Sequence, residues 1–192
     1  MITVFDNFIE DQDLLDEINN NFVDLFKDPG KYKWYDGWWN SEANTTIKKI
    51  IKYAWSDNCP LNLTLSIAGF EYWTGIQSAS HTDKFWKDGL AAHLDKDEEA
   101  LDKTGEWQVP ILGCVYYPEG QNFVGGDLHI YTSGLDNSPE VVKAKPNRLV
   151  VFNAGYDYHG VSTVTDGVRH AIAFNLWQEA PYSKQNGVLT IE

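Results

Sequence analysis

The second half of the chain consists largely of short apolar segments separated by turn residues. From residue 105 onward, almost every segment has the β-branched, aliphatic and aromatic composition of a strand, and turns such as residues 134–139 separate these segments. Many short strands at this spacing are typical of an antiparallel sandwich or a jelly roll. The predicted strands in this half are residues 109–118, 125–133, 140–145, 147–153, 159–164 and 168–177.

The first third of the chain contains two amphipathic helical patterns. Apolar residues recur at helical spacing over residues 11–26 and again over residues 44–57, where Ile47, Ile50 and Ile51 belong to one stripe. Two helices followed by many strands predict an α+β domain in which the helices pack on one sheet. Further strands are predicted at residues 2–5, 61–67 and 69–75.

Length, charge and cysteine content limit the class of protein. The 192 residues suit a single domain, which we divide into a helical support region at residues 1–58 and a strand core at residues 60–178. The chain has no apolar run of about 18 residues, no signal-peptide pattern and only two cysteines, which predicts a cytoplasmic protein without a membrane span. The formal net charge of −13 repels phosphate backbones and disfavours a nucleic-acid partner.

The last two predicted strands suggest a hairpin with an unusual polar face. If Thr165, Asp166 and Gly167 form a three-residue loop, His159 and Arg169 lie on the same face, together with small alanines. Four strand positions separate the two side chains, or roughly 13 Å at about 3.3 Å per residue. A metal on His159 and the planar guanidinium of Arg169 could then hold the two ends of a small dicarboxylate. A two-residue turn would instead place the two side chains on opposite faces.

Two His-X-Asp pairs precede this region, His81/Asp83 and His93/Asp95. On an extended chain, residues i and i+2 point the same way, so each pair can present two metal ligands. With a distant histidine such as His159, one pair would complete the two-histidine, one-carboxylate triad of non-haem Fe(II) oxygenases. We favour His93 and Asp95, because an apolar approach leads into His93. In addition, the next predicted strand begins about 14 residues past Asp95 but about 26 past Asp83, and short connections are the norm.

These segments together resemble a known enzyme family. Residues 60–178 are similar to the Fe(II)/2-oxoglutarate-dependent oxygenases, and especially to their prolyl-4-hydroxylase-like branch. The similar segments are HLDKDEE, VPILGCVYYP, GGDLHIYTS, NRLVVFNAGYDYHGV, GVRHAIAFNLW and the strand-helix opening ITVFDNFIEDQDLLDEI. The resemblance implies a double-stranded β-helix (jelly roll) core with the N-terminal helices packed on one sheet.

The resemblance also implies cofactors and the roles of particular residues. His93, Asp95 and His159 would be the catalytic iron ligands, and Arg169 would bind the C5 carboxylate of 2-oxoglutarate together with Tyr117. Fe(II) would be the metal, 2-oxoglutarate the co-substrate, and ascorbate a further cofactor that the family allows. The implied reaction hydroxylates a C–H bond of a peptide, an amino acid or a small metabolite and releases succinate and CO2. Because many animal prolyl hydroxylases have lysine where this chain has Arg169, prolyl specificity is not implied.

A second class of protein also fits the strand pattern. A jelly-roll binding module, similar to cupins or lectins, would hold a metal or a sugar without redox chemistry. Arg169 favours the oxygenase, because a simple metal site does not need a carboxylate anchor. A nucleic-acid demethylase of the same superfamily is disfavoured by the negative charge.

Several other residues have both a structural and a functional interpretation. Tyr72 is expected mainly to pack in the core, His129 to be a hydrogen-bonded strand residue, and His170 to be structural. Asn175 and Trp177 share the parity of the predicted arginine anchor, so they either line the substrate entrance or support the fold. The charged run at residues 95–103 is predicted to be a solvated helix, and residues 31–40 and 74–91 are candidate walls of the cleft.

Overall fold

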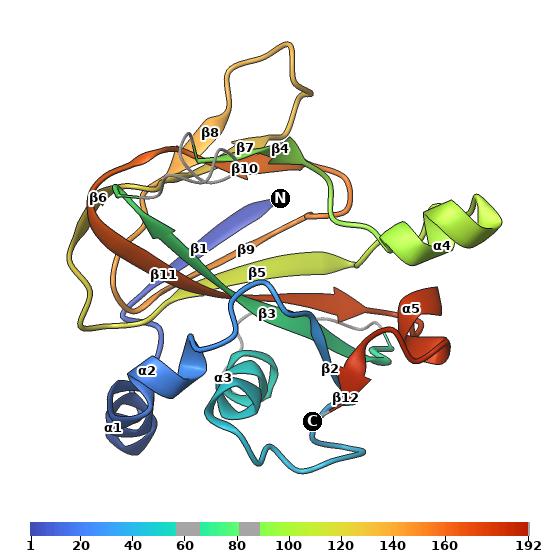
Figure 1. Ribbon diagram of the computed structural model, residues 1–192, viewed down its shortest axis with the longest axis horizontal. Helices are drawn as coiled ribbons and strands as arrows, with labels where there is room; N and C mark the ends of the chain where they lie inside the picture. The colour runs from blue at the N-terminus through green and yellow to red at the C-terminus, as the bar shows by residue number, and fades with distance from the viewer. Residues whose placement is uncertain (57–65, 81–88, 192) are drawn as a thin grey trace.

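Two largely antiparallel sheets face each other, and the N-terminal helices cover the outer side of the larger sheet (Figure 1). The computed structural model describes residues 1–56, 66–80 and 89–191. The strands are β1 (Ile2–Asp6), β2 (Lys33–Tyr35), β3 (Gly69–Ser78), β4 (Leu90–His93), β5 (Leu112–Tyr117), β6 (Phe123–Gly125), β7 (Leu128–Tyr131), β8 (Glu140–Val142), β9 (Arg148–Phe152), β10 (Tyr158–Val161), β11 (Val164–Trp177) and β12 (Thr190–Ile191). The helices are α1 (Gln12–Asn20), α2 (Phe22–Leu25), α3 (Thr46–Trp55), α4 (Glu98–Thr104) and α5 (Tyr182–Gln185).

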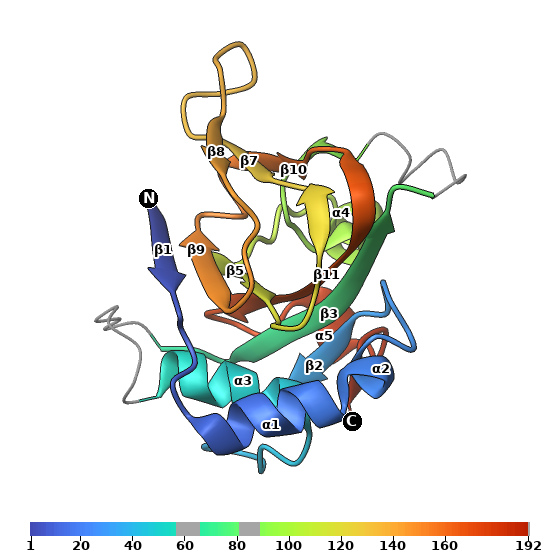
Figure 2. The same ribbon diagram turned by 90° about the vertical axis from the view of Figure 1, so that its left-hand side faces the viewer.

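Strand order within the two sheets confirms the predicted jelly roll. Over the described residues, the larger sheet runs β1-β9-β5-β11-β3-β2-β12 with β6 paired to β11, and the smaller sheet runs β4-β10-β7-β8 (Figure 2). The chain crosses repeatedly from one sheet to the other, as in a double-stranded β-helix. Strands β1, β2 and β12 lengthen the larger sheet beyond residues 60–178, so the predicted helical support region also supplies strands.

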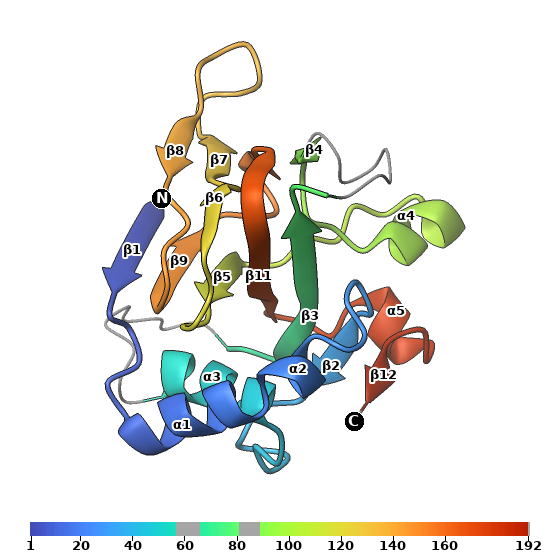
Figure 3. The same ribbon diagram turned by 60° about the vertical axis from the view of Figure 1, so that its left-hand side comes forward.

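Helices α1 and α3 pack on the larger sheet, because each has one apolar face (Figure 3). Asp11 caps α1 by accepting a hydrogen bond from the Leu14 backbone N–H, and Thr45 caps α3. The single helix predicted at residues 11–26 is instead two helices, because Asn21 leaves helical geometry with φ −98° and ψ 8°. None of the described helices is long and apolar enough to cross a membrane.

Alternate residues of β11 point to opposite sides of the larger sheet. Ile172, Phe174 and Leu176 are buried against the helices, in a core that also contains Ile51. Ala171 points the other way and packs with residues of β7, β8 and β9. The space between the two sheets is therefore lined by the odd-numbered residues of β11, since side chains alternate along a strand.

The predicted hairpin between the last two strands is wrong. Strand β10 pairs with β4 and β7, and β11 pairs with β3, β5 and β6. Residues 165–167 lie inside β11, where Gly167 has φ 71° and pairs with Phe123 of β6. A Cβ atom at Gly167 would lie only 2.2 Å from the Asn122 carbonyl oxygen. The glycine therefore permits an irregular, close strand pairing rather than a turn.

Other predicted elements are largely confirmed. The charged run after residue 95 contains α4, whose N-terminus is capped by Asp97. Residues 74–78 belong to β3, so the predicted cleft-wall loop at residues 74–91 begins later than expected. The strand predicted at residues 61–67 lies mostly outside the described residues.

Candidate active site

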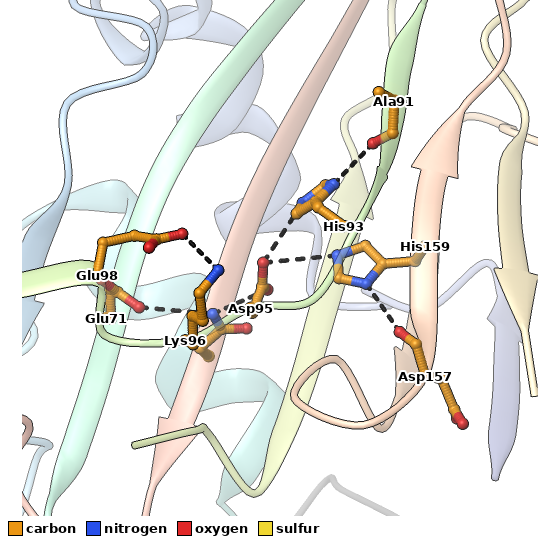
Figure 4. A network of polar contacts seen from close by, with 9 residues as sticks. Glu71, Ala91, His93, Asp95, Lys96, Glu98, Asp157 and His159 are labelled. Atoms are coloured by element: carbon orange, nitrogen blue, oxygen red, sulfur yellow. Dashed lines mark hydrogen bonds and ion pairs between the residues drawn. The ribbon is translucent and has the colours of Figure 1, made fainter. Parts of the chain in front are cut away.

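Three predicted ligand residues converge between the sheets. His93 ends β4, Asp95 follows two residues later, and His159 lies on β10 directly opposite His93 in the strand pairing. Their potential ligand atoms all lie within 4.8 Å of one another. Figure 4 shows the three side chains pointing toward a common centre, where the Nε2 atoms of both histidines lie 3.5 Å from Asp95 Oδ1.

Backbone carbonyls orient both imidazoles. His93 Nδ1 lies 2.9 Å from the Ala91 carbonyl oxygen, and His159 Nδ1 lies 3.1 Å from that of Asp157. With the proton on Nδ1, each ring donates to its carbonyl and leaves the Nε2 lone pair available to a metal at the common centre. In metal sites, a hydrogen bond from the second ring nitrogen to a carbonyl oxygen commonly orients the metal-binding histidine.

Asp95 is an ionised carboxylate in a partly enclosed place. Burial raises the pKa of Asp95, but hydrogen bonding and the charges of His159 and His93 lower it more, so the net pKa lies well below its usual range. For His93 the directions are opposite: burial lowers its pKa, but the hydrogen bond and the charge of Asp95 outweigh burial. The net pKa of His93 is therefore raised above its usual value. Asn175 Nδ2 donates to Asp95 Oδ2 at 3.0 Å, which leaves Oδ1 directed at the two imidazoles. Two imidazoles and one carboxylate are the donor set that suits non-haem Fe(II), so the residues present fit this metal.

Arg169 lies on the interior face of β11 and is only 4% exposed. Its Nη1 donates to Gln77 Oε1 at 3.1 Å, and its Nη2 donates to the Tyr117 hydroxyl oxygen at 3.4 Å. The guanidinium carbon lies 5.0 Å from the centre of the Tyr117 ring. Within the described part of the chain, Arg169 has no carboxylate partner, and its buried Nε has no hydrogen-bond acceptor.

A buried guanidinium without a counter-charge fits a dianionic ligand. Removing a charge from water costs free energy unless an opposite charge or sufficient hydrogen bonds replace the water. Two glycines leave room near this arginine. A Cβ atom at Gly75 would meet no atom within 4 Å, so the space beside it is open. A Cβ atom at Gly126 would lie 2.5 Å from Arg169 Cδ, so only glycine lets the arginine side chain pass there. The residues present therefore fit 2-oxoglutarate, whose distal carboxylate would accept from the guanidinium.

A cleft of about 420 Å³ opens beside His93 and Asp95. Glu71 and Asn175 are among its lining residues. The Asn175 amide lies between two carboxyl groups: its Nδ2 donates to Asp95 Oδ2 at 3.0 Å and to Glu71 Oε2 at 3.5 Å. Burial raises the pKa of Glu71, and the charge of Asp95 adds to this, so the value reaches about 8.

Two of these residues were not singled out from the sequence, although Gln77 lies within the predicted cleft wall at residues 74–91. Gln77 and Glu71 both lie on β3, where they pair with Arg169 and Asn175 of β11. Since side chains alternate along a strand, the sequence shows that Glu71 and Gln77 lie on the same face of β3. No local feature of the sequence indicates that β3 lies beside β11. The contacts of these two residues with the site could have been predicted only if the pairing of β3 with β11 had been known.

The remaining candidates lie elsewhere or serve the core. Tyr72 is buried against the helices, and His129 lies on the outward-facing side of β7, away from the buried Leu128 and Ile130. His170 packs edge-on against Phe22 and Phe26 on the helical side, as a structural residue does. The alternative metal pair, His81 and Asp83, lies outside the described residues.

Comparisons with known proteins agree with this geometry. Residues 74–177, more than half of the chain, match the model of the 2OG-Fe(II) oxygenase superfamily. No curated protein sequence gives a significant match. A prolyl-4-hydroxylase from Pseudomonas putida has a similar fold, with a TM-score of 0.58, 17% sequence identity and 93% of each chain covered.

A second solved structure has the same fold. It is a prolyl hydroxylase from Trichoplax adhaerens in complex with a hypoxia inducible factor peptide fragment, with a TM-score of 0.53 and 14% identity over 92% of this chain and 83% of the other. At such identities the likeness supports the double-stranded β-helix fold, and the family match identifies the chemistry. The chain belongs to the 2OG-Fe(II) oxygenase superfamily and is an enzyme that uses Fe(II) and 2-oxoglutarate.

Proposed function

We propose that His93, Asp95 and His159 hold the iron and that Arg169 and Tyr117 hold the distal carboxylate of 2-oxoglutarate. The observation that carries this proposal is the convergence of three ligand atoms within 4.8 Å beside an interior that contains a buried arginine with no counter-charge in the described part of the chain. A non-redox binding module has no use for such an arginine, and the family match also argues against that alternative.

The reaction we propose is hydroxylation of a C–H bond of a small molecule or a peptide. When bound, Fe(II) and 2-oxoglutarate supply the oxidising chemistry, with O2 consumed and succinate and CO2 released. The protein residues orient these groups: Asn175 fixes one oxygen of Asp95, and backbone carbonyls fix both imidazoles. The relative from Trichoplax adhaerens was solved with a peptide, which supports a peptide as one substrate class. Two cysteines in 192 residues also support a reducing, cytoplasmic location.

The proposed ligands can be tested with single histidine variants. We expect the wild-type protein to form succinate from 2-oxoglutarate when Fe(II) is supplied, and His93→Ala to abolish both tight Fe(II) binding and succinate formation. His129→Ala is a matched control, because this histidine lies on the same sheet but faces outward. His81→Ala is expected to retain Fe(II) binding. Isothermal titration under nitrogen measures the affinities, and loss of binding in His81→Ala with retention in His93→Ala would refute the assignment.

A further inference from the structure

The cleft beside the candidate iron centre has an aromatic wall. Tyr32 and Trp73 both line it, and their ring centres lie 4.8 Å apart. The volume of about 420 Å³ suits a small molecule or one extended side chain. Because His93 and Asp95 line the same cleft, a molecule in it would present its atoms to the candidate metal centre.

Most charged groups of the cleft are already satisfied by the protein. Asp97 accepts hydrogen bonds from the backbone N–H groups of Ala100 and Ser183. Lys96 Nζ lies 2.6 Å from a carboxylate oxygen of Glu98, so this cation is paired. Glu99 lies in the first turn of α4, where the helix dipole favours a negative charge. These groups therefore have structural reasons for their positions and do not indicate a ligand.

Glu71 is different, because it is a partly buried carboxylate without a cation. Asn175 donates to it, but within the described residues it has no salt-bridge partner. Burial, with the negative charge of Asp95, disfavours the charged form of Glu71 and raises its pKa. A carboxylate removed from water is stabilised when a positive charge lies next to it. Glu71 therefore leaves an unmet requirement for a cation inside the cleft.

We propose that the substrate carries an aliphatic ammonium group, which Glu71 binds and the rings of Tyr32 and Trp73 cover. Aromatic faces within about 6 Å attract such a cation, and an alkyl chain extending from it would bring a C–H bond toward the metal centre. The net charge of −13 further favours the approach of a cation over that of an anion. This inference rests on the proposed function, since it takes the cleft to be the substrate site of the oxygenase.

The test compares probes that differ only in the ammonium group. L-lysine supplies a side-chain ammonium on a free amino acid, and Nα-acetyl-lysine methylamide supplies it on a peptide-like unit. L-norleucine and Nα-acetyl-norleucine methylamide are the matched probes, which lack only the side-chain ammonium group. Binding to the full chain, with Fe(II) and 2-oxoglutarate under nitrogen, is measured by isothermal titration. We expect at least one lysine probe to bind at least ten-fold more tightly than its own norleucine counterpart, and the tighter of the two lysine probes identifies the source.

The variant Glu71→Gln tests the residue itself. Glutamine keeps the shape of the side chain, so we expect the preference for lysine over norleucine to fall by at least ten-fold. Glu140→Gln makes the same change of charge at an exposed position on β8, and we expect it to keep the preference. Equal affinity for lysine and norleucine in the wild type, or an unchanged preference in Glu71→Gln, would overturn the inference.

Failure of this inference is distinguishable from failure of the proposed function. Succinate formation without added substrate, combined with equal binding of lysine and norleucine, would leave the oxygenase site in place and reject the cationic substrate. Lysine binding that depends on Glu71, in a protein that binds neither Fe(II) nor 2-oxoglutarate, would retain the cation site and reject the proposed iron and co-substrate residues.

Discussion

At the scale of single residues, Arg169 shows how burial can reveal a ligand. The guanidinium of Arg169 is 4% exposed and donates to the neutral groups of Gln77 and Tyr117. Among residues 1–56, 66–80 and 89–191 it lacks the counter-charge that buried cations normally have. Both neighbours orient the guanidinium without neutralising it. A bound dicarboxylate would complete the site, and the planar fork of arginine suits two carboxylate oxygens.

We expect Arg169→Ala to weaken 2-oxoglutarate binding strongly while leaving Fe(II) affinity nearly unchanged. Truncating one partner of a buried charge pair costs about 2–5 kcal/mol, which is about 30- to 5,000-fold in the dissociation constant. Arg169→Lys keeps the charge but loses the fork, so an intermediate effect is expected. Anaerobic titration measures both affinities, and wild-type affinity for 2-oxoglutarate in Arg169→Ala would show that the anchor lies elsewhere.

Glu71 is expected to make the stability of the metal-free protein decrease with pH. Burial, with the charge of Asp95, raises the pKa of Glu71 to about 8, above its ordinary value of 4.5. Between these values the folded chain holds a proton that the unfolded chain has released, so the free energy of unfolding falls as pH rises.

Glu71→Gln removes this decrease. We expect the variant to gain at least about 1 kcal/mol relative to the wild type at pH 9, since each unit of pKa corresponds to about 1.4 kcal/mol. The gain should be absent at pH 4, where Glu71 is protonated in both states. Urea denaturation at the two pH values measures the difference, and an identical difference at both would contradict the assigned pKa.

At the scale of elements, the connection between β6 and β7 makes room for the arginine. Gly126 has φ 69°, and a Cβ atom there would lie 2.5 Å from Arg169 Cδ. Gly126 is therefore required for two reasons: its backbone conformation favours glycine, and the arginine side chain approaches it closely. The stem of Arg169 extends past this glycine, so the connection helps to set the direction of the guanidinium.

We expect Gly126→Ala to weaken 2-oxoglutarate binding by about ten-fold or more, because the added methyl group displaces Arg169. Gly134→Ala is the matched control: Gly134 has φ 84°, but a Cβ atom there would meet nothing within 4 Å. Both variants carry the same kind of backbone strain, so only the steric contact differs. Equal 2-oxoglutarate affinities in the two variants would exclude a role for this contact.

At the scale of the whole molecule, the helices and the larger sheet share one core. Apolar residues of α1 and α3 are buried together with those of β3, β5 and β11, so the helices share their apolar core with the sheet. This arrangement supports the proposal that residues 1–192 form a single domain. It also implies that loss of helix packing would expose the outer side of the sheet whose inner side carries Arg169 and Asn175.

We expect Ile51→Ala to destabilise the entire protein by about 2–5 kcal/mol, because it opens a cavity between α3 and the sheet. Val23→Ala, at a position that is 84% exposed, is expected to change stability by less than about 0.5 kcal/mol. Circular dichroism and tryptophan fluorescence should report one common transition in Ile51→Ala. Separate transitions would argue for two independently folding regions.

Local patterns in the sequence identified many of the strands and the residues that can bind a metal. Alternation is a local property, so β5, β7, β9 and β11 were found close to their observed positions, and His93, Asp95 and His159 were selected from their spacing and the family resemblance. The break at Asn21 was missed, because its backbone geometry is not visible in the apolar pattern of residues 11–26.

The pairing of strands, and therefore which side chains meet, became visible only in the folded chain. His159 and Arg169 were predicted to share one face of a hairpin, yet they belong to different sheets, since β10 pairs with β4 and β11 pairs with β3. Both side chains still point into the space between the sheets, because each lies on the inward-facing side of its own sheet. Gln77 and Glu71 could not be predicted, since their roles depend on contacts with residues about 90 and 100 positions away. Pairing over such separations depends on which apolar faces can be buried together, and that is a property of the folded chain rather than of any segment.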